Sequence, residues 1–195
     1  KTLEEPPAHA VLVLTTSAAS AVPATVRSRC RSLHLRPLPG SVVAEALAVG
    51  WGVAPERATF LAGLSAGRLG WAVRAVGDDA VLAHRGVWLD ALDEVLGADR
   101  AGRLARAARL ADPPEALPEA LATWQGWWRD VLLVQHALEG SIVNRDRLAA
   151  LHAAAARYAV AQAVAALRGI DDALAHLGAS ANARLALDVL VLGLP

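Results

Sequence analysis

Two patterns of apolar residues divide the chain. The segment 10–16, AVLVLTT, is continuously apolar and ends in hydroxyls, which is typical of a strand buried on both faces of a sheet. In 33–36, leucine alternates with polar residues, which predicts a second short strand. From Ser41 onward the apolar residues follow the spacing of an α-helix. We therefore expect a small α/β segment followed by a helical remainder.

The helical part is expected to form two groups of helices, separated by a break at 77–79. A further short helix is expected between the two strands, with Ser20 as its cap, Pro23 in its first turn and Arg29 at its C-terminal end. The bounds expected for the two groups are 41–49, 55–66 and 68–76, and then 79–96, 99–111, 115–139, 144–157, 158–177 and 182–193.

The composition excludes several classes of protein. The 195 residues carry 19 basic and 19 acidic side chains, so the overall charge gives no long-range attraction to nucleic acid or to an anionic membrane. No apolar run is long enough to span a membrane. One cysteine, Cys30, cannot form an internal disulfide, which favours a cytoplasmic location. The abrupt opening KTLEEPP and the absence of methionine suggest the C-terminal part of a longer protein.

Most candidate catalytic and binding motifs lack the residues, or the spacing between residues, that their chemistry requires. The phosphate loop GxxxxGK[ST] cannot occur, because Lys1 is the only lysine. Ser28 and His34 lack the context of a nucleophile elbow. Cys30 has no second cysteine, so we expect a small buried apolar residue. The six histidines show no metal-binding spacing and are expected to be surface or structural residues: His9, His34, His84, His136, His152 and His176.

The tryptophans favour packing over the stacking of nucleic-acid bases. Most lie at helical spacing beside leucines, which predicts a core or a subunit interface. Three of them spread around one helix more widely than a single core-facing stripe requires. The six are Trp51, Trp71, Trp88 and, on that one helix, Trp124, Trp127 and Trp128.

The segment 24–32, ATVRSRCRS, holds the remaining candidate. Its three arginines alternate around Cys30. An arginine mounted rigidly near the rim of an α/β sheet can enter a neighbour's nucleotide site and neutralise charge on the transferred phosphoryl group. Arg29 is the candidate for that role, and a solvated charge cluster is the alternative.

The order of these segments resembles the clamp-loader branch of the AAA+ ATPases. KTLEEPP, a strand ending in LTT, TVRSRC and SLHLRPLP follow one another, and Ser-Arg-Cys is a signature of that family. The resemblance implies that Arg29 is an arginine finger acting in trans on the ATP-Mg of an adjacent subunit. It also implies that Ser28 and Cys30 set the loop geometry, and that Thr15 and Thr16 occupy the sensor 1 position.

Within that family, the chain is most similar to the delta-prime subunits of bacterial DNA polymerase III. LSAGRLGWAV (64–73) resembles the start of the last lid helix, where ATP-hydrolysing subunits carry the sensor 2 arginine. Gly70 occupies that position here, and Arg68 lies two residues early. WWRDVLLVQ, VNRDRLAAL and NARLALDVLVLGLP resemble helices of the collar domain. Arg129 and Asp130, within the first of these, are expected to have a fold-specific structural role, with a local surface ion pair as the alternative.

The resemblance implies a mainly α fold with three parts. These are the end of an α/β AAA+ core at 1–37, a three-helix lid at 38–78 and a helical-bundle collar at 79–195. The fragment would bind no metal, because the family's four-cysteine zinc module would precede Lys1. It would bind no cofactor, because the ATP-Mg would belong to the neighbouring subunit.

The implied function is that of a subunit in the DNA polymerase III holoenzyme with no intrinsic activity of its own. Its partners would be the gamma/tau ATPase and delta subunits and, through the assembled complex, the sliding clamp and primer-template DNA, with no membrane. Two alternatives stay open: an ATP-hydrolysing gamma/tau-type subunit, and a non-catalytic helical adaptor in which Arg29 is solvated. Direct DNA binding is disfavoured, because no basic stripe with interleaved aromatic residues occurs.

Overall fold

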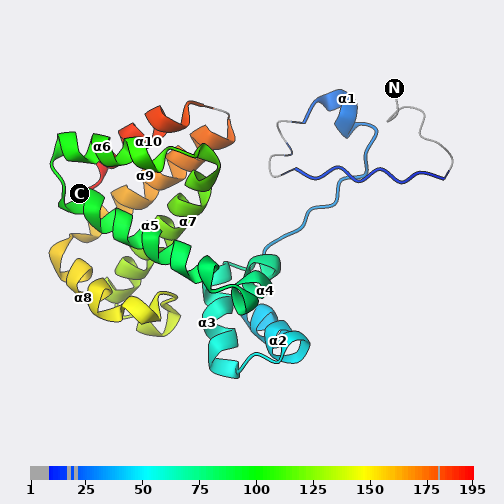
Figure 1. The fold of residues 1–195 in the computed structure, drawn as a ribbon, viewed down its shortest axis with the longest axis horizontal. Helices are drawn as coiled ribbons and strands as arrows, with labels where there is room; N and C mark the ends of the chain where they lie inside the picture. Colours follow the sequence, from blue (N-terminus) through cyan, green and yellow to red (C-terminus); the bar gives the residue numbers. More distant parts are fainter. Residues whose placement is uncertain (1–8, 17–18, 20–21, 180) are drawn as a thin grey trace. The chain divides into compact units, whose positions relative to one another are not determined.

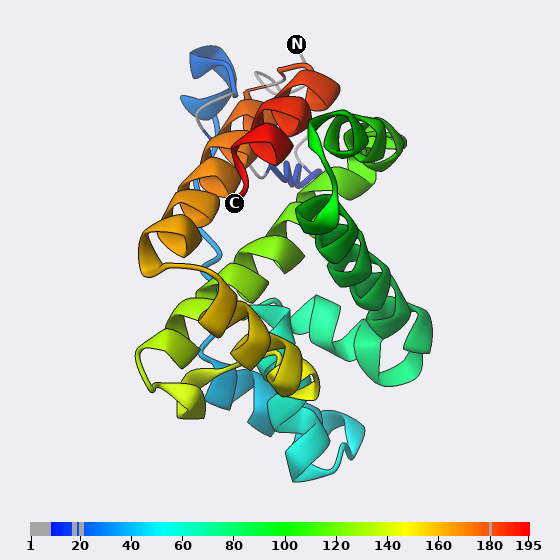
Figure 2. The same cartoon turned by 90° about the vertical axis from the view of Figure 1, so that its left-hand side faces the viewer.

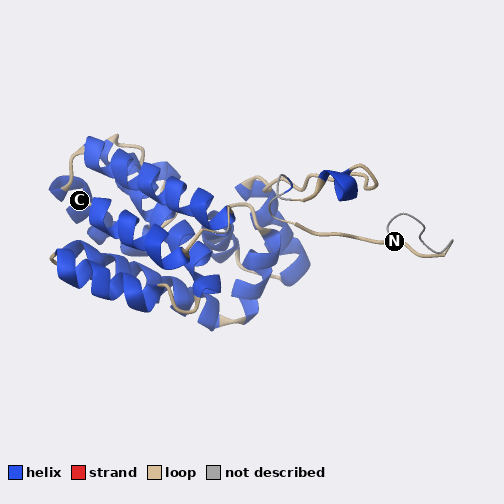
Figure 3. Cartoon of the chain, turned by 90° about the horizontal axis from the view of Figure 1, so that it is seen from above, coloured by secondary structure: helices blue, strands red, loops and turns tan. Residues whose placement is uncertain are grey.

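A computed structural model of the chain describes residues 9–16, 19, 22–179 and 181–195. The chain divides into two compact units, Lys1–Arg36 and Pro37–Pro195 (Figure 1), and each is described by itself. Within the described residues, all regular secondary structure is helical (Figure 3). The expectation of a mainly α protein is therefore confirmed.

In the first unit the predicted short helix is present, and the two predicted strands are not. Helix α1 spans Ala24–Arg27 directly after Pro23, whereas Ser20 and KTLEEPP lie outside the described residues. The segments 10–16 and 33–36 are irregular and exposed. A strand needs a neighbour for its backbone groups and a layer to cover its apolar side chains. No described segment of this unit supplies either, so the strand prediction is wrong here.

Three short helices open the second unit. They are α2 (Gly40–Trp51), α3 (Pro55–Ser65) and α4 (Leu69–Gly77). Pro55 stands in the first turn of α3, where its missing N–H costs nothing. Gly52, at φ +65°, ends α2 in a left-handed conformation. The helices enclose a core whose members are Val43, Leu47, Val53, Ala58, Leu61, Ala62, Trp71, Ala72 and Ala75.

Six further helices form a bundle that includes α7. They are α5 (Asp79–Gly97), α6 (Arg100–Leu110), α7 (Leu117–Gln135), α8 (Leu148–Arg157), α9 (Val160–Gly178) and α10 (Ala183–Gly193). Short 3₁₀ turns connect some of them: η2 (Pro114–Ala116), η3 (Glu139–Ser141) and η4 (Arg145–Arg147). Helix α7 packs against α5, α8 and α9, and α10 lies beside α6 and α9 (Figure 2). All nine helices predicted after Ser41 are present, and the segment predicted at 115–139 divides into η2 and α7, with η3 beginning at Glu139.

Local sequence fixes where several of these helices begin. The side chains of Asp78, Asp99 and Asn182 each accept a hydrogen bond from a backbone N–H in the first turn of α5, α6 and α10. Such caps satisfy donors that have no partner inside the helix. None of the helices that the structure describes is long and apolar enough to cross a membrane.

The tryptophans of α7 belong to the core of the bundle. Trp124 and Trp128 are fully buried and Trp127 is 5% exposed, because α7 has helices on several sides. A core position is therefore confirmed for these three side chains, and a subunit interface is not. Trp71 is buried in the three-helix core, whereas Trp51, at the end of α2, is 49% exposed.

Candidate functional site

The Ser28-Arg29-Cys30 segment forms the turn that follows α1. The Ser28 N–H donates to the Ala24 carbonyl at 2.9 Å, and the Arg29 N–H donates to the Val26 carbonyl at 3.1 Å. Both side chains also bond back to the helix: Ser28 Oγ donates to the Thr25 carbonyl at 3.1 Å, and Arg29 Nη1 donates to the same carbonyl at 2.7 Å. The turn therefore holds the guanidinium of Arg29 against the end of α1, while the residue stays exposed.

Cys30 is half-buried and not a fully buried core residue, so that expectation is wrong. No described residue in 9–36 is fully buried. A four-residue helix with irregular flanks has too little apolar surface to enclose a side chain.

The other motif positions do not gather around Arg29. Thr15 and Thr16 lie in the exposed, irregular segment that was expected to be a strand. Gly70 belongs to the second unit, where it is exposed in the first turn of α4, and a Cβ added there would meet no atom within 4 Å. Arg68 is the residue that precedes α4, and its Nε donates to the Ser65 carbonyl at 3.0 Å. The sensor assignments stay predictions.

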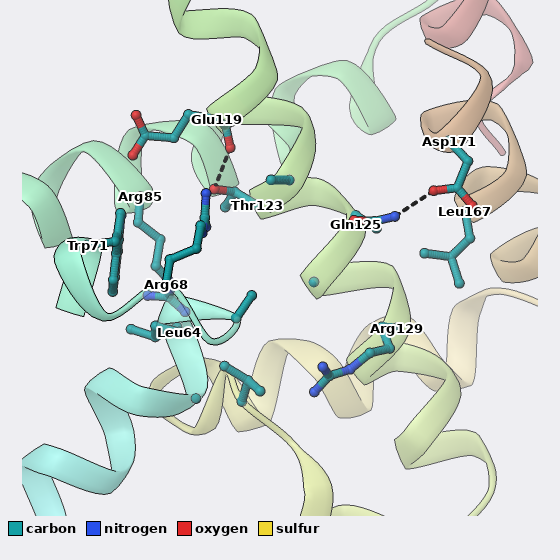
Figure 4. Close-up of a pocket in the computed structure, with 15 residues that line it drawn as sticks. Leu64, Arg68, Trp71, Arg85, Glu119, Thr123, Gln125, Arg129, Leu167 and Asp171 are labelled. Carbon is teal, nitrogen blue, oxygen red and sulfur yellow. Dashed lines mark hydrogen bonds between the residues drawn. The ribbon is translucent and has the colours of Figure 1, made fainter. Parts of the chain in front are cut away.

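The second unit contains a cavity of about 450 Å³ that no sequence motif indicated (Figure 4). It lies between the α3–α4 turn and helices α5, α7 and α9, and its polar lining includes Arg68, Arg85, Glu119, Gln125, Arg129 and Asp171. Most of these side chains already have partners inside the protein. Gln125 Nε2, for example, donates to Asp171 Oδ1 at 2.5 Å.

A buried polar network lies beside this cavity and centres on Asp130. The Asp130 side chain is fully buried, and its Oδ2 accepts hydrogen bonds from the backbone N–H of Val143 at 3.0 Å and from the N–H and Nδ2 of Asn144, both at 2.7 Å. Arg129 Nη2 donates to Asp130 Oδ1 at 3.1 Å. The expected structural role is therefore supported for Asp130, whereas Arg129, whose side chain is 50% exposed, forms the local ion pair with it.

The contacts of Arg85 with this network were not predicted from the sequence. Arg85, on α5, donates from Nη2 to Asn144 Oδ1 at 2.5 Å and from Nη1 to Asp146 Oδ2 at 2.8 Å. Arg85 is 9% exposed. The network thus ties α5 and α7 to the loop that precedes α8. No local pattern could have found a pairing between residues about sixty positions apart.

The histidines occupy the surface. All six are exposed, in agreement with the expected surface or structural role. In the part of the chain that the structure describes, no group of three or more His, Cys, Asp or Glu residues is arranged to hold a metal ion.

Comparison with known families gives a match to the beginning of the chain. The family described as DNA polymerase III, delta subunit, matches residues 1–39, which are 39 of the 195 residues. Comparisons with curated proteins and with solved structures give no significant match. The matched segment contains Ser28-Arg29-Cys30, and the match supports a relation to the clamp-loader-type proteins of DNA polymerase III.

Proposed function

We propose that the chain is a delta-prime-like subunit of the bacterial DNA polymerase III clamp loader. It helps to load the sliding clamp onto primed DNA and donates Arg29 to the ATP site of an adjacent subunit. The observation that carries this proposal is the family match over residues 1–39, which includes the Ser-Arg-Cys motif. Gly70, at the position where ATP-hydrolysing subunits carry an arginine, favours delta-prime over a gamma/tau-type subunit.

The local geometry of Arg29 is compatible with a finger acting in trans. The side chain is exposed on a turn, and Nη1 is held by one backbone carbonyl at 2.7 Å. Exchanging that bond for a phosphate oxygen forfeits about 0.5–1.5 kcal/mol. A charge-assisted, bidentate contact between arginine and phosphate is stronger than a neutral hydrogen bond. A phosphate contact would therefore be favoured over the bond to the Thr25 carbonyl.

In this proposal ATP and Mg²⁺ belong to the neighbouring subunit. Arg29 supplies positive charge where negative charge develops on the transferred phosphoryl group. Ser28 and Cys30 shape the turn. Helices α2–α4 form the lid, and α5–α10 form the collar that holds the ring together with the gamma/tau and delta subunits.

The test compares ATP hydrolysis by the assembled complex, stimulated by clamp and primed DNA, for wild type, Arg29→Ala and Arg29→Lys. At the site that Arg29 serves, we expect Arg29→Ala to slow hydrolysis roughly 10³-fold or more, as for arginine fingers elsewhere. Arg29→Lys should restore little of the rate of ATP hydrolysis, because lysine keeps the positive charge but lacks the planar guanidinium group.

The matched control is Arg74→Ala, which removes an exposed arginine from the last turn of α4. It should leave hydrolysis unchanged. Gel filtration checks that every variant still enters the ring. Wild-type hydrolysis by an intact ring that carries Arg29→Ala would contradict the proposal.

A further inference from the structure

Three arginine side chains from different elements line the cavity of the second unit. Arg68 comes from the turn before α4, Arg85 from α5 and Arg129 from α7. Figure 4 shows Arg68 and Arg85 on one side, near Trp71, and the guanidinium of Arg129 directed toward the cavity from the other side. Guanidinium groups bind oxyanions through paired N–H donors. The cavity therefore has the donors that a small oxyanion requires.

Each of these arginines keeps N–H donors that the described part of the protein does not use. Arg68 donates only from Nε, to the Ser65 carbonyl, and Arg129 donates only from Nη2. Arg85 is 9% exposed, and its Nε is buried without an acceptor among the described residues. A buried N–H without an acceptor is costly. An oxygen atom of a ligand in the cavity would supply that acceptor.

The ion pairs around the cavity leave one of the three positive charges unpaired. Arg85 pairs with Asp146 at 2.8 Å, and Arg129 pairs with Asp130 at 3.1 Å. Arg68 forms no ion pair with any described residue. Its charge is therefore available to an anionic ligand.

Two carboxylates also line the cavity and limit the charge of that ligand. Glu119 and Asp171 are both exposed, so water screens them. Figure 4 shows the Glu119 carboxylate at the edge of the cavity, and Asp171 accepts a hydrogen bond from Gln125. A multiply charged group would still be repelled by both. A singly charged carboxylate suits the site better than a phosphate dianion.

Much of the remaining lining is apolar. It includes Leu64, Trp71, Val143 and Leu167. The volume of about 450 Å³ lies within the usual range for small-molecule sites, which combine an apolar lining with a few polar groups. The lining therefore favours a ligand with an apolar body over a bare inorganic ion.

We propose that this cavity binds a small organic molecule that carries one carboxylate on an apolar body. The carboxylate binds the guanidinium groups of Arg68, Arg85 and Arg129, and the apolar body packs against Leu64 and Trp71. Because the ligand binds only the folded chain, it raises the stability of the second unit. The site is separate from Arg29 and does not rest on the proposed clamp-loader function.

The test is a titration of the full chain with benzoate, followed by two-dimensional NMR of its N–H groups. We expect saturable shifts of the Trp71 indole N–H and the Gly126 amide N–H, since both residues line the cavity, with a Kd in the millimolar range or below. Benzyl alcohol has the same ring without the charge. It should bind roughly tenfold more weakly or less, because it cannot form hydrogen bonds between two charged groups.

Two variants test the location of the site. Arg68→Gln removes the unpaired charge and should weaken benzoate binding roughly ten- to a hundredfold. Its matched control is Arg74→Gln, at an exposed position of α4 outside the cavity. Gly126→Leu should fill the cavity and abolish binding, because a Cβ there meets no atom within 4 Å. Its control is Gly50→Leu on α2, where an added Cβ also meets no atom.

Far-UV circular dichroism verifies the fold of each variant. Wild-type chain that shows no saturable shift up to about 10 mM benzoate would overturn the proposal, as would wild-type affinity in folded Arg68→Gln or Gly126→Leu. Equal affinity for benzyl alcohol would reject the anionic ligand. Tighter binding of phenyl phosphate than of benzoate would reject the carboxylate as the head group.

Discussion

At the scale of single residues, Asp130 is a buried charged side chain with several hydrogen-bond partners in the second unit. It is fully buried, and one of its oxygens accepts three hydrogen bonds from residues 143 and 144. Without the carboxylate, these donors would stay buried without an acceptor, which costs more than the net value of the bonds themselves.

Asp130→Ala should therefore lower the free energy of unfolding by about 3 kcal/mol or more, because each buried donor left without an acceptor costs about 1–3 kcal/mol. The measurement is urea unfolding followed by circular dichroism. The control is Asp188→Ala, which removes a surface ion pair with Arg184 at 2.8 Å and should cost about 0–1 kcal/mol. Similar small losses for both variants would contradict a structural role for Asp130.

The sequence indicated that Asp130 is structural, but not why. Its neighbour Arg129 is adjacent in the chain, so a local pair could be anticipated. Asn144 and Arg85 come from other elements. Only the tertiary packing brings Asn144 to Asp130 and Arg85 to Asn144.

At the scale of elements, the turn between α3 and α4 depends on one glycine. Gly67 has φ +80°, and its carbonyl accepts a hydrogen bond from the Leu38 N–H at 3.0 Å. A Cβ at Gly67 would lie 2.5 Å from the Leu38 oxygen and 2.8 Å from the Leu38 nitrogen. These are backbone atoms, so the contact cannot be relieved by a side-chain rotation.

We expect Gly67→Ala to lower the melting temperature, because a left-handed conformation costs a non-glycine residue about 1–3 kcal/mol before the clash is counted. Gly70→Ala is the control. It lies within α4 with no atom within 4 Å of its added Cβ, so it should stabilise the protein by about 0.5–1 kcal/mol. Thermal unfolding of both variants measures the difference, and a neutral Gly67→Ala would refute the tight turn.

Helices were predictable from sequence, whereas strands were not. Periodicity, caps and the positions of proline and glycine are local signals, and they located every helix after Ser41 to within a few residues, apart from the 115–139 segment. A strand acquires its hydrogen bonds from a different segment, so AVLVLTT alone could not establish one.

At the scale of the whole molecule, the two hydrophobic cores lie entirely in the second unit. Their members run from Val43 to Leu194, and no described residue in 9–36 is fully buried. Most of the apolar area removed from water, and hence most of the stabilisation, therefore belongs to residues 37–195.

A chain of residues 37–195 alone should consequently fold with the melting temperature of the full chain. Calorimetry of the two proteins provides the comparison. A melting temperature lowered by more than about 4 °C, which corresponds to roughly 1–2 kcal/mol for a domain of this size, would mean that the first unit contributes to the cooperative core.

The sequence by itself determined the helices, because helical periodicity depends on residues near one another in the chain. Tertiary structure decided which apolar faces are covered. It buried the three α7 tryptophans in the bundle instead of leaving them for a neighbour, and it joined Asp130 to Asn144 and Arg85. It also left 10–16 without a partner strand. Burial and long-range pairing depend on which elements meet in space, and that information lies in no single segment of the sequence.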